Sequence, residues 1–196
     1  MIEITRLDPQ SYRRTPWKNG GGVTVDIADA YRPDVAPGSW EGMLWRFGRT
    51  QIVAPGPFSD LSGYDRILTV IGGRGLVLEV ADGAALDVRA PLMPVRFPGE
   101  TRITSRLEAG PVEVMNLMAD RTHTIDVAIL SGADTRSLAS GVHVLYAPIG
   151  PASFAIDGES HSLAADHALR VDTDAGFSLA HAAGTLAVAS VMPSAT

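Results

Sequence analysis

The first residues capable of chemistry form the segment Trp17-Lys-Asn-Gly-Gly-Gly-Val-Thr24. Three successive glycines let the backbone adopt positive φ and bring bare N–H groups close to a ligand or another strand. A phosphate-binding P-loop needs Gly-Lys-Ser/Thr after its glycines, whereas Lys18 precedes them here, so this class of site is excluded. The segment is equally compatible with a ligand-lining loop and with a glycine-rich turn into a strand over residues 23–27.

A second group, Gly56-Pro-Phe-Ser-Asp-Leu-Ser-Gly-Tyr-Asp-Arg66, precedes an apolar run and the turn Gly73-Arg-Gly75. This pattern resembles the first cupin motif, in which histidines and a glutamate commonly bind metal. Arg66 stands seven positions before Gly73, where that glutamate is usual, and a cation there would repel a divalent metal. An arginine on the barrel wall could instead hold a carboxylate, which would offset the cost of burying its charge.

The histidines do not form a pattern typical of metal ligands. All five lie at or after His123, and none follows Pro98-Gly-Glu-Thr-Arg102, where a metal-binding cupin usually offers one. His161 and His167 are six residues apart, which matches neither the helical i, i+4 pair nor a strand pair. We therefore expect no metal and no cofactor, and we expect the histidines to be surface residues or hydrogen-bonded core residues.

Strand alternation assigns a face to the amide of Asn116. In the run Val112-Glu-Val-Met-Asn-Leu-Met118, Asn116 lies on the face opposite Glu113. If Glu113 reaches solvent, Asn116 points inward, where it either ties down a neighbouring loop or contacts a ligand. The same alternation over residues 43–48 separates Trp45 and Phe47 from Arg46, and it favours core aromatics with an exterior arginine.

No catalytic residue emerges from the remaining candidates. The chain has no cysteine and no Gly-x-Ser-x-Gly, and no histidine is near Ser59 or Ser62 in sequence. Asp60 and Asp65 could form a carboxylate pair, but acids in such a segment are usually turn formers.

Short β-rich runs separated by Gly, Pro and Asp supply the elements that would position these residues. Hydrophobic residues make up 45% of the 196 and charged residues 19%, values typical of a compact globular protein. Regular strand and turn spacing predicts an all-β sandwich or barrel. The clearest expected strands are residues 43–47, 66–71, 75–80, 112–118, 125–130, 142–146, 154–156, 168–172 and 185–192.

A weak internal repeat predicts two β-barrels in tandem. The run from Leu68 through Asp82-Gly83 to Met118 has a shorter counterpart from Val144 through Asp157-Gly158 to Met192. The expected fold is therefore a double cupin, with an N-terminal barrel over residues 1–121 that carries the ligand pocket. A closely packed C-terminal barrel would span residues 122–196.

Charge and the N-terminal residues limit the partners and the location. The formal net charge is −6, and residues 1–121 hold fourteen basic against fifteen acidic residues, so the chain lacks the basic stripe of a nucleic-acid binder. No apolar segment approaches the length of a membrane span, and no signal-peptide pattern opens the chain. We expect a cytoplasmic protein that binds neither nucleic acid nor membrane.

Taken together, the motifs resemble the HutD/Ves family over about residues 1–121. Two departures are Asp26, where the family more often has Glu, and Leu61-Ser62, which replaces the usual Phe-Pro. The motifs that carry the resemblance are Trp17-Lys-Asn-Gly-Gly-Gly-x-Thr24, Trp45-Arg46, Gly56-Pro-Phe-Ser59, Gly63-x-Asp65-Arg66, Gly73-x-Gly75, Asn116-Leu-Met118 and Arg121.

The resemblance implies a metal-independent, often dimeric bicupin encoded beside histidine-utilisation enzymes in many bacteria. Such a protein is thought to bind a small carboxylate metabolite, a pathway intermediate such as formylglutamate or urocanate, and to tune flux through the pathway. Carried onto this chain, it has Arg66 meet a carboxylate of the ligand. The expected ligand-binding residues are Arg66, Lys18, Asn19, Phe58, Asn116 and Trp17.

Two other functions remain open from the sequence. The chain could be an enzyme, either a metal-dependent oxygenase or isomerase, or a metal-free isomerase or hydrolase that uses Lys18 or Asp65 as acid and base. It could also have a structural role in which the second barrel serves as a dimer platform.

Overall fold

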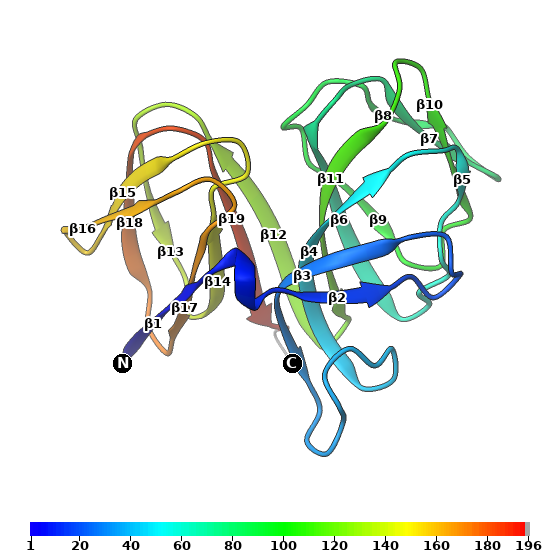
Figure 1. Cartoon of the computed structure of the whole chain (residues 1–196). Helices are drawn as coiled ribbons and strands as arrows, with labels where there is room; N and C mark the ends of the chain where they lie inside the picture. Colours follow the sequence, from blue (N-terminus) through cyan, green and yellow to red (C-terminus); the bar gives the residue numbers. More distant parts are fainter. Residues whose placement is uncertain (195–196) are drawn as a thin grey trace. The chain divides into compact units, whose positions relative to one another are not determined.

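A computed structural model describes residues 1–194, which divide into two compact units (Figure 1). The N-terminal unit is Arg13–Thr122. The C-terminal unit combines Met1–Tyr12 with the chain from His123 onward. In the described residues the only helical element is the 3₁₀ turn η1 (Pro9–Ser11), and every strand pairing is antiparallel, so the predicted all-β class is confirmed.

Two antiparallel sheets make up the N-terminal unit. The six-stranded sheet has the order β2-β3-β4-β11-β6-β9, and the four-stranded sheet has the order β5-β10-β7-β8. The strands are β2 (Arg13–Pro16), β3 (Val23–Tyr31), β4 (Met43–Ile52), β5 (Gly56–Pro57), β6 (Tyr64–Gly72), β7 (Leu76–Val80), β8 (Leu86–Val88), β9 (Val95–Pro98), β10 (Ile103–Leu107) and β11 (Val112–Asp120).

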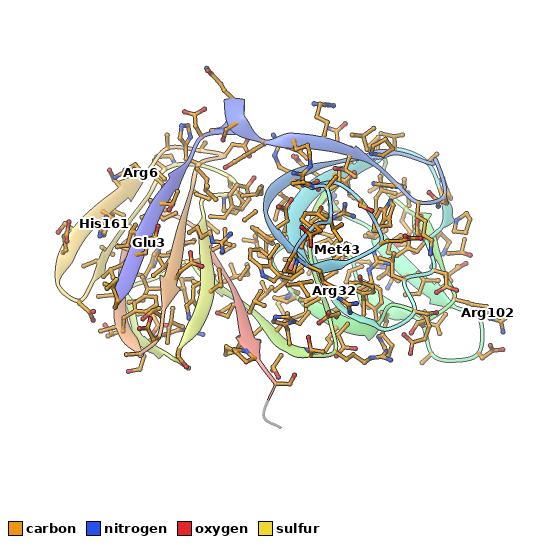
Figure 2. All side chains as sticks on the ribbon, turned by 90° about the horizontal axis from the view of Figure 1, so that it is seen from below. Glu3, Arg6, Arg32, Met43, Arg102 and His161 are labelled. Carbon is orange, nitrogen blue, oxygen red and sulfur yellow. The ribbon has the colours of Figure 1, made fainter. Side chains whose placement is uncertain are left out.

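Side chains from both sheets form the core of this unit, because alternate residues of each strand point to the same face. Leu68 and Val70 from β6 and Val112 and Val114 from β11 pack with residues of β7, β8 and β10 in one buried cluster. A second cluster gathers around Met43, which lies inside the unit, whereas Arg102 lies on its periphery (Figure 2). The inner face of the six-stranded sheet is thus apolar toward the Val112 end of β11.

The C-terminal unit also consists of two antiparallel sheets, with the orders β1-β17-β14-β19-β12 and β13-β18-β15-β16. Leu145, Phe154, Leu169, Leu179 and Val188 are among the residues of its continuous buried cluster. The strands are β1 (Ile2–Leu7), β12 (His123–Leu130), β13 (Asp134–Leu138), β14 (Gly141–Tyr146), β15 (Ala152–Ile156), β16 (Glu159–Leu163), β17 (Ala168–Thr173), β18 (Phe177–Ala183) and β19 (Leu186–Pro193).

The division of the chain differs from the expected barrels over residues 1–121 and 122–196. The boundary between Thr122 and His123 lies next to the expected one, but residues 1–12 belong to the C-terminal unit. The reason is that β1 pairs with β17 along its whole length, from Ile2 opposite Thr173 to Leu7 opposite Ala168. In the structure the first twelve residues thus belong with the C-terminal unit rather than with the N-terminal barrel.

Candidate anion-binding cavity

A small cavity lies at the end of the N-terminal unit's core where polar residues replace apolar ones. It measures about 50 Å³, which leaves room for a few water molecules or for one small carboxylate anion. Strands β4, β6 and β11 form its floor, and segments before β3, before β4 and after β5 supply aromatic walls. The lining residues that matter here are Trp17, Trp40, Arg46, Phe58, Arg66 and Asn116.

Strand register places two arginines in one row across the floor. Met118 of β11 is directly opposite Arg46 of β4 on one side and Arg66 of β6 on the other. Strands in a sheet are about 4.8 Å apart, so the backbones of the two arginines are separated by roughly 10 Å. Both arginines line the same small cavity, from the two strands that flank β11.

Arg66 is buried without an oppositely charged partner. Its side chain is 7% exposed, and among residues 1–194 it makes no ion pair and its Nε has no hydrogen-bond partner. Its guanidinium carbon lies 5.2 Å from the ring centre of Phe58 and 5.1 Å from that of Phe97, within cation–π range. Burial, together with the charge of Arg46, lowers the pKa of the Arg66 guanidinium to about 10, so the group is charged at neutral pH.

Arg46 is also buried, with 1% of its surface exposed, and its guanidinium carbon lies 4.1 Å from the ring centre of Trp40. The expectation of an exterior arginine was therefore wrong. Trp45 and Phe47 are buried as well, so β4 has two buried faces and alternation could not tell which one meets solvent. Arg46 has a counterion, because its Nε lies 3.6 Å from Oδ1 of Asp26.

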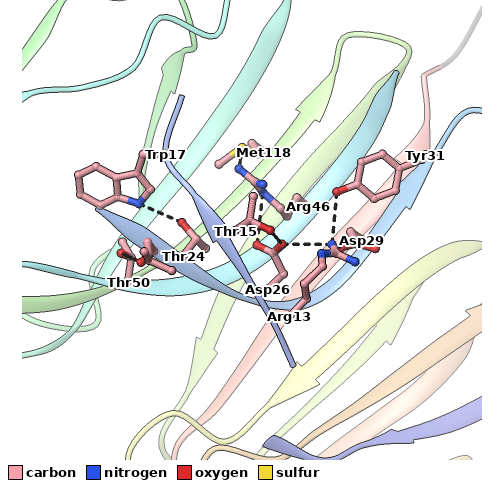
Figure 3. A network of polar contacts seen from close by, with 11 residues as sticks. Arg13, Thr15, Trp17, Thr24, Asp26, Asp29, Tyr31, Arg46, Thr50 and Met118 are labelled. Carbon is pink, nitrogen blue, oxygen red and sulfur yellow. Dashed lines mark hydrogen bonds and ion pairs between the residues drawn. The ribbon is translucent and has the colours of Figure 1, made fainter. Parts of the chain in front are cut away.

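Asp26 connects Arg46 to a polar network on β2 and β3 (Figure 3). Its Oδ2 accepts hydrogen bonds from Oγ1 of Thr15 at 2.5 Å and from the guanidinium of Arg13 at 3.1 Å. Arg13 also pairs with Asp29 and donates to the hydroxyl of Tyr31 at 3.3 Å. Burial raises the pKa of the Asp26 carboxyl, and the contacts with Arg46, Thr15 and Arg13 oppose that increase.

Asn116 points into the cavity, as alternation against Glu113 predicts. It is 8% exposed, and its Oδ1 has no hydrogen-bond partner among the described residues. It stands opposite Gly48 of β4 and Leu68 of β6. A buried amide oxygen without a partner is costly, so this atom is available to a donor on a ligand or to an ordered water.

The triple-glycine segment forms a turn that holds Trp17 at the wall of the cavity. The Trp17 N–H donates to the carbonyl of Gly22 at 2.9 Å, and the indole Nε1 donates to Oγ1 of Thr24 at 3.1 Å. A Cβ at Gly22 would meet the indole ring at 2.9 Å, and Gly20 has φ +72°. The sequence left a turn and a ligand-lining loop open, and the segment is a turn whose tryptophan lines the cavity.

The structure brings together four of the six residues expected around a ligand: Arg66, Phe58, Asn116 and Trp17 all line the cavity. Lys18 and Asn19 do not. Nζ of Lys18 donates to the carbonyl of Asp60 at 3.3 Å, and Nδ2 of Asn19 donates to that of Pro57 at 2.9 Å. These two side chains hold the turn against the segment that carries Phe58.

Of the residues considered for other chemistry, Ser59 lines the cavity, and the others lie elsewhere. Asp65 does not line the cavity, and its Oδ1 is 3.2 Å from Nε of Arg121. Within residues 1–194, no group of three or more His, Asp or Glu side chains is arranged to hold a metal ion. His143 and His181 are buried and hydrogen-bonded, to Oγ of Ser190 and to the carbonyl of Gly132 respectively.

Four residues that shape this site were not expected there from the sequence: Arg46, Asp26, Trp40 and Phe97. Phe97 faces Arg66 directly across β9 and β6. Trp40 belongs to the long segment between β3 and β4, where no periodicity indicates a position. Arg46 carried a usable signal, because it shares its strand face with Gly48, which stands opposite Asn116.

Comparison of the whole fold identifies the class of protein. The chain superposes with a TM-score of 0.53 on a cupin 2 conserved barrel domain protein from Leptotrichia buccalis, over 87% of this chain and 88% of that one, at 4% identity. Identity this low bears on the fold alone. The chain is thus a cupin-like all-β protein whose N-terminal unit holds a cavity with two buried arginines.

The particular family follows from closer matches. The family model described as HutD matches residues 9–188, and the chain belongs to the HutD family. HutD from Pseudomonas fluorescens SBW25, solved in a formate condition, superposes with a TM-score of 0.79 at 26% identity, over 98% of this chain and all of that one. The resemblance found in the sequence is confirmed.

A curated relative from Pseudomonas putida is described as an uncharacterized 21.2 kDa protein in the hutC 3′ region. It is 36% identical over 118 residues. The match spans 60% of this chain and 59% of the length of that protein.

As for location, none of the helices in residues 1–194 is long and apolar enough to cross a membrane.

Proposed function

We propose that this protein is a bicupin that binds a small carboxylate-bearing metabolite in the cavity of its N-terminal unit and regulates histidine utilisation in the cytoplasm. One observation carries the proposal. Arg66 is a buried cation that faces the cavity without a counterion among the described residues. A buried charge is costly unless it is paired, and a carboxylate would supply the missing partner in the forked geometry that guanidinium prefers.

Two further features support a carboxylate that carries a donor close by. Oδ1 of Asn116 lacks a partner and would accept a hydrogen bond from an N–H or O–H of the ligand. The aromatic walls formed by Trp17, Trp40 and Phe58 suit a flat or apolar ligand body. Formylglutamate and urocanate both have a carboxylate and an N–H, and the size of the cavity suits the carboxylate end of either.

The link to histidine utilisation rests on the family and on the curated relative from the hutC 3′ region. A regulatory role, rather than turnover, accords with the nature of the cavity lining. Its polar groups are the two arginines, the amide of Asn116 and the hydroxyls of Thr24, Thr50 and Ser59. Among residues 1–194, the lining contains no histidine or carboxylate that could activate a hydroxyl, and neither Lys18 nor Asp65 contributes to it.

Calorimetric titration with N-formylglutamate, urocanate and acetate tests the proposal, and neutral acetamide serves as the isosteric control for acetate. We expect acetate to bind and acetamide not to bind. Arg66→Met keeps most of the side-chain volume and removes the charge. It should weaken binding by about 2 kcal/mol or more, a factor of roughly 30 in Kd.

Arg74→Met is the matched control, because Arg74 is exposed in the turn between β6 and β7 and should leave Kd unchanged. Wild-type affinity in Arg66→Met would remove Arg66 as the carboxylate partner, and failure of the wild type to bind any of these acids would overturn the function. NMR spectra of each mixture over several hours should show the acid unaltered, whereas conversion would favour an enzyme.

A further inference from the structure

We infer that Asp26 sets the charge selectivity of the cavity. The cavity would accept an anionic group with one negative charge and reject a group with two. This inference rests on the proposed function and adds the class of anion to it. It concerns the charge that enters the cavity, so a larger dicarboxylic ligand could bind with one carboxylate inside and the other outside.

Two arginines and one nearby carboxylate set the balance of charges at the cavity. Arg46 and Arg66 are the only ionisable side chains among the lining residues that the structure describes. Arg46 already has a carboxylate, since its Nε is 3.6 Å from Oδ1 of Asp26. Arg66 has none. The cavity therefore carries one uncompensated positive charge, which matches one carboxylate.

Asp26 compensates the charge of Arg46 more than that of Arg13, although it contacts both. Arg13 has its own carboxylate in Asp29, with which it forms a salt bridge. The side chain of Arg13 is 35% exposed, so water screens its charge, whereas the side chains of Asp26 and Arg46 are both 1% exposed. Arg46 and Asp26 thus compensate each other where screening is weakest.

Hydrogen bonds from β2 hold the carboxylate of Asp26 in place. Thr15 and Arg13 donate to Oδ2, while Oδ1 faces Arg46 without a hydrogen bond. A separation of 3.6 Å is too long for a hydrogen bond but still within the range of an ion pair. Nε and one terminal nitrogen of Arg46 accordingly have no hydrogen-bond partner among the described residues. Asp26 therefore acts on Arg46 through its charge rather than through a hydrogen bond.

Removal of the Asp26 charge should change which anion the cavity prefers. In Asp26→Asn the cavity would hold two uncompensated cations, and a dianion would gain more than a monoanion. Acetate and oxalate are suitable probes, because oxalate brings two adjacent carboxylates into the same space. One unmatched charge a few ångströms away, at an effective dielectric constant of about 20, should shift the ratio of the two Kd values toward oxalate by roughly tenfold or more.

Calorimetry on the full chain measures this ratio in the wild type, in Asp26→Asn and in the matched control Asp29→Asn. Asp29 is the other carboxylate paired with Arg13, so its loss should leave the acetate-to-oxalate ratio unchanged. An unchanged ratio in Asp26→Asn, or an equal shift in Asp29→Asn, would overturn the inference.

Asp26→Asn leaves Arg46 buried without a counterion and could unfold, so a charge-balanced double variant provides a second test. Asp26→Asn with Arg46→Gln removes both members of the pair, and Arg66 again supplies a single cation. This variant should keep the wild-type preference for acetate, and a preference for oxalate would contradict the inference. If the wild type binds none of acetate, oxalate, N-formylglutamate and urocanate, the proposed function itself fails. If it binds acetate and the ratios do not follow the charges, only the role of Asp26 fails.

Discussion

The two cavity arginines differ in how the protein compensates their buried charge. Arg46 has Asp26 nearby and the ring of Trp40 over its guanidinium, whereas Arg66 has two aromatic rings and no carboxylate. Cation–π contacts contribute far less than a full counterion to the stability of a buried charge. Arg66 is therefore the position where a bound anion would relieve the largest cost of burial.

Arg66 was predictable from the sequence because of its fixed distance from Gly73 in the first cupin motif. The inward position of Arg46 was not predictable by alternation, because both faces of β4 are buried. The pairing of Asp26 with Arg46 was not predictable either, because a bulge between Asp26 and Ala28 shifts the register of β3 against β4. Contacts between strands distant in sequence decide such details.

A buried histidine in the C-terminal unit gives a pH-dependent prediction. His143 of β14 contacts Ser190 and the carbonyl of Ala139, and burial lowers the pKa of its imidazole. Because the folded state holds this proton less tightly than the unfolded chain, the stability present above about pH 6.5 is lost as the pH falls through the folded pKa.

Thermal unfolding at pH 7.5 and pH 5 should therefore show a smaller decrease of Tm in His143→Gln than in the wild type. The glutamine amide can still donate to the carbonyl of Ala139. His167→Gln is the control, since His167 lies in a turn at the surface and should leave the pH-dependent decrease in place. An identical decrease in His143→Gln would show that this imidazole does not contribute.

Among the elements, the turn over residues 17–22 determines where the wall of the cavity lies. Gly20 needs positive φ, and Gly22 leaves space for the Trp17 ring. The glycine triplet could be recognised from sequence as a turn. Its contact with the segment around Phe58 depends on hydrogen bonds from Lys18 and Asn19 to carbonyls some forty residues away, which no local pattern indicates.

We predict that Gly22→Ala moves the Trp17 indole and weakens acetate binding, because the added methyl group would meet that ring at 2.9 Å. Gly20→Ala should instead cost about 1 kcal/mol of stability through its positive φ, with a smaller effect on binding. Tryptophan fluorescence and calorimetry separate the two effects. Gly56→Ala is the control, since a Cβ there meets nothing within 4 Å. Unchanged fluorescence and affinity in Gly22→Ala would refute this account of the turn.

The strands themselves were predictable to different degrees. Runs dominated by apolar residues, such as 66–71 and 112–118, correspond to β6 and β11, because both faces of these strands are largely buried. Short strands with exposed polar residues, such as β2, β13 and β16, were not expected, because their pattern is that of a loop. Pairing with a neighbouring strand, rather than apolar content, makes these segments β-strands.

For the whole molecule, the chain does not divide at one point in the sequence. Residues 1–12 add a strand to the C-terminal unit, and this changes the distribution of charge as well. The N-terminal unit holds thirteen basic and thirteen acidic residues, so the formal charge of −6 lies entirely on the C-terminal unit. The candidate anion cavity thus belongs to the unit without net negative charge.

The position of β1 at the edge of its sheet leads to a last prediction. Five of its six residues are exposed, so hydrogen bonds to β17, rather than core packing, hold this strand in place. Removal of residues 2–7 should leave one edge of β17 unpaired and accelerate hydrogen exchange of amides in Ala168–Thr173, with a lower Tm. Amides of β11, which pair with β4 and β6, should keep their protection and serve as the internal control. If exchange in β17 is unaltered by the truncation, residues 2–7 do not stabilise the edge of β17 and are not an integral part of the C-terminal unit.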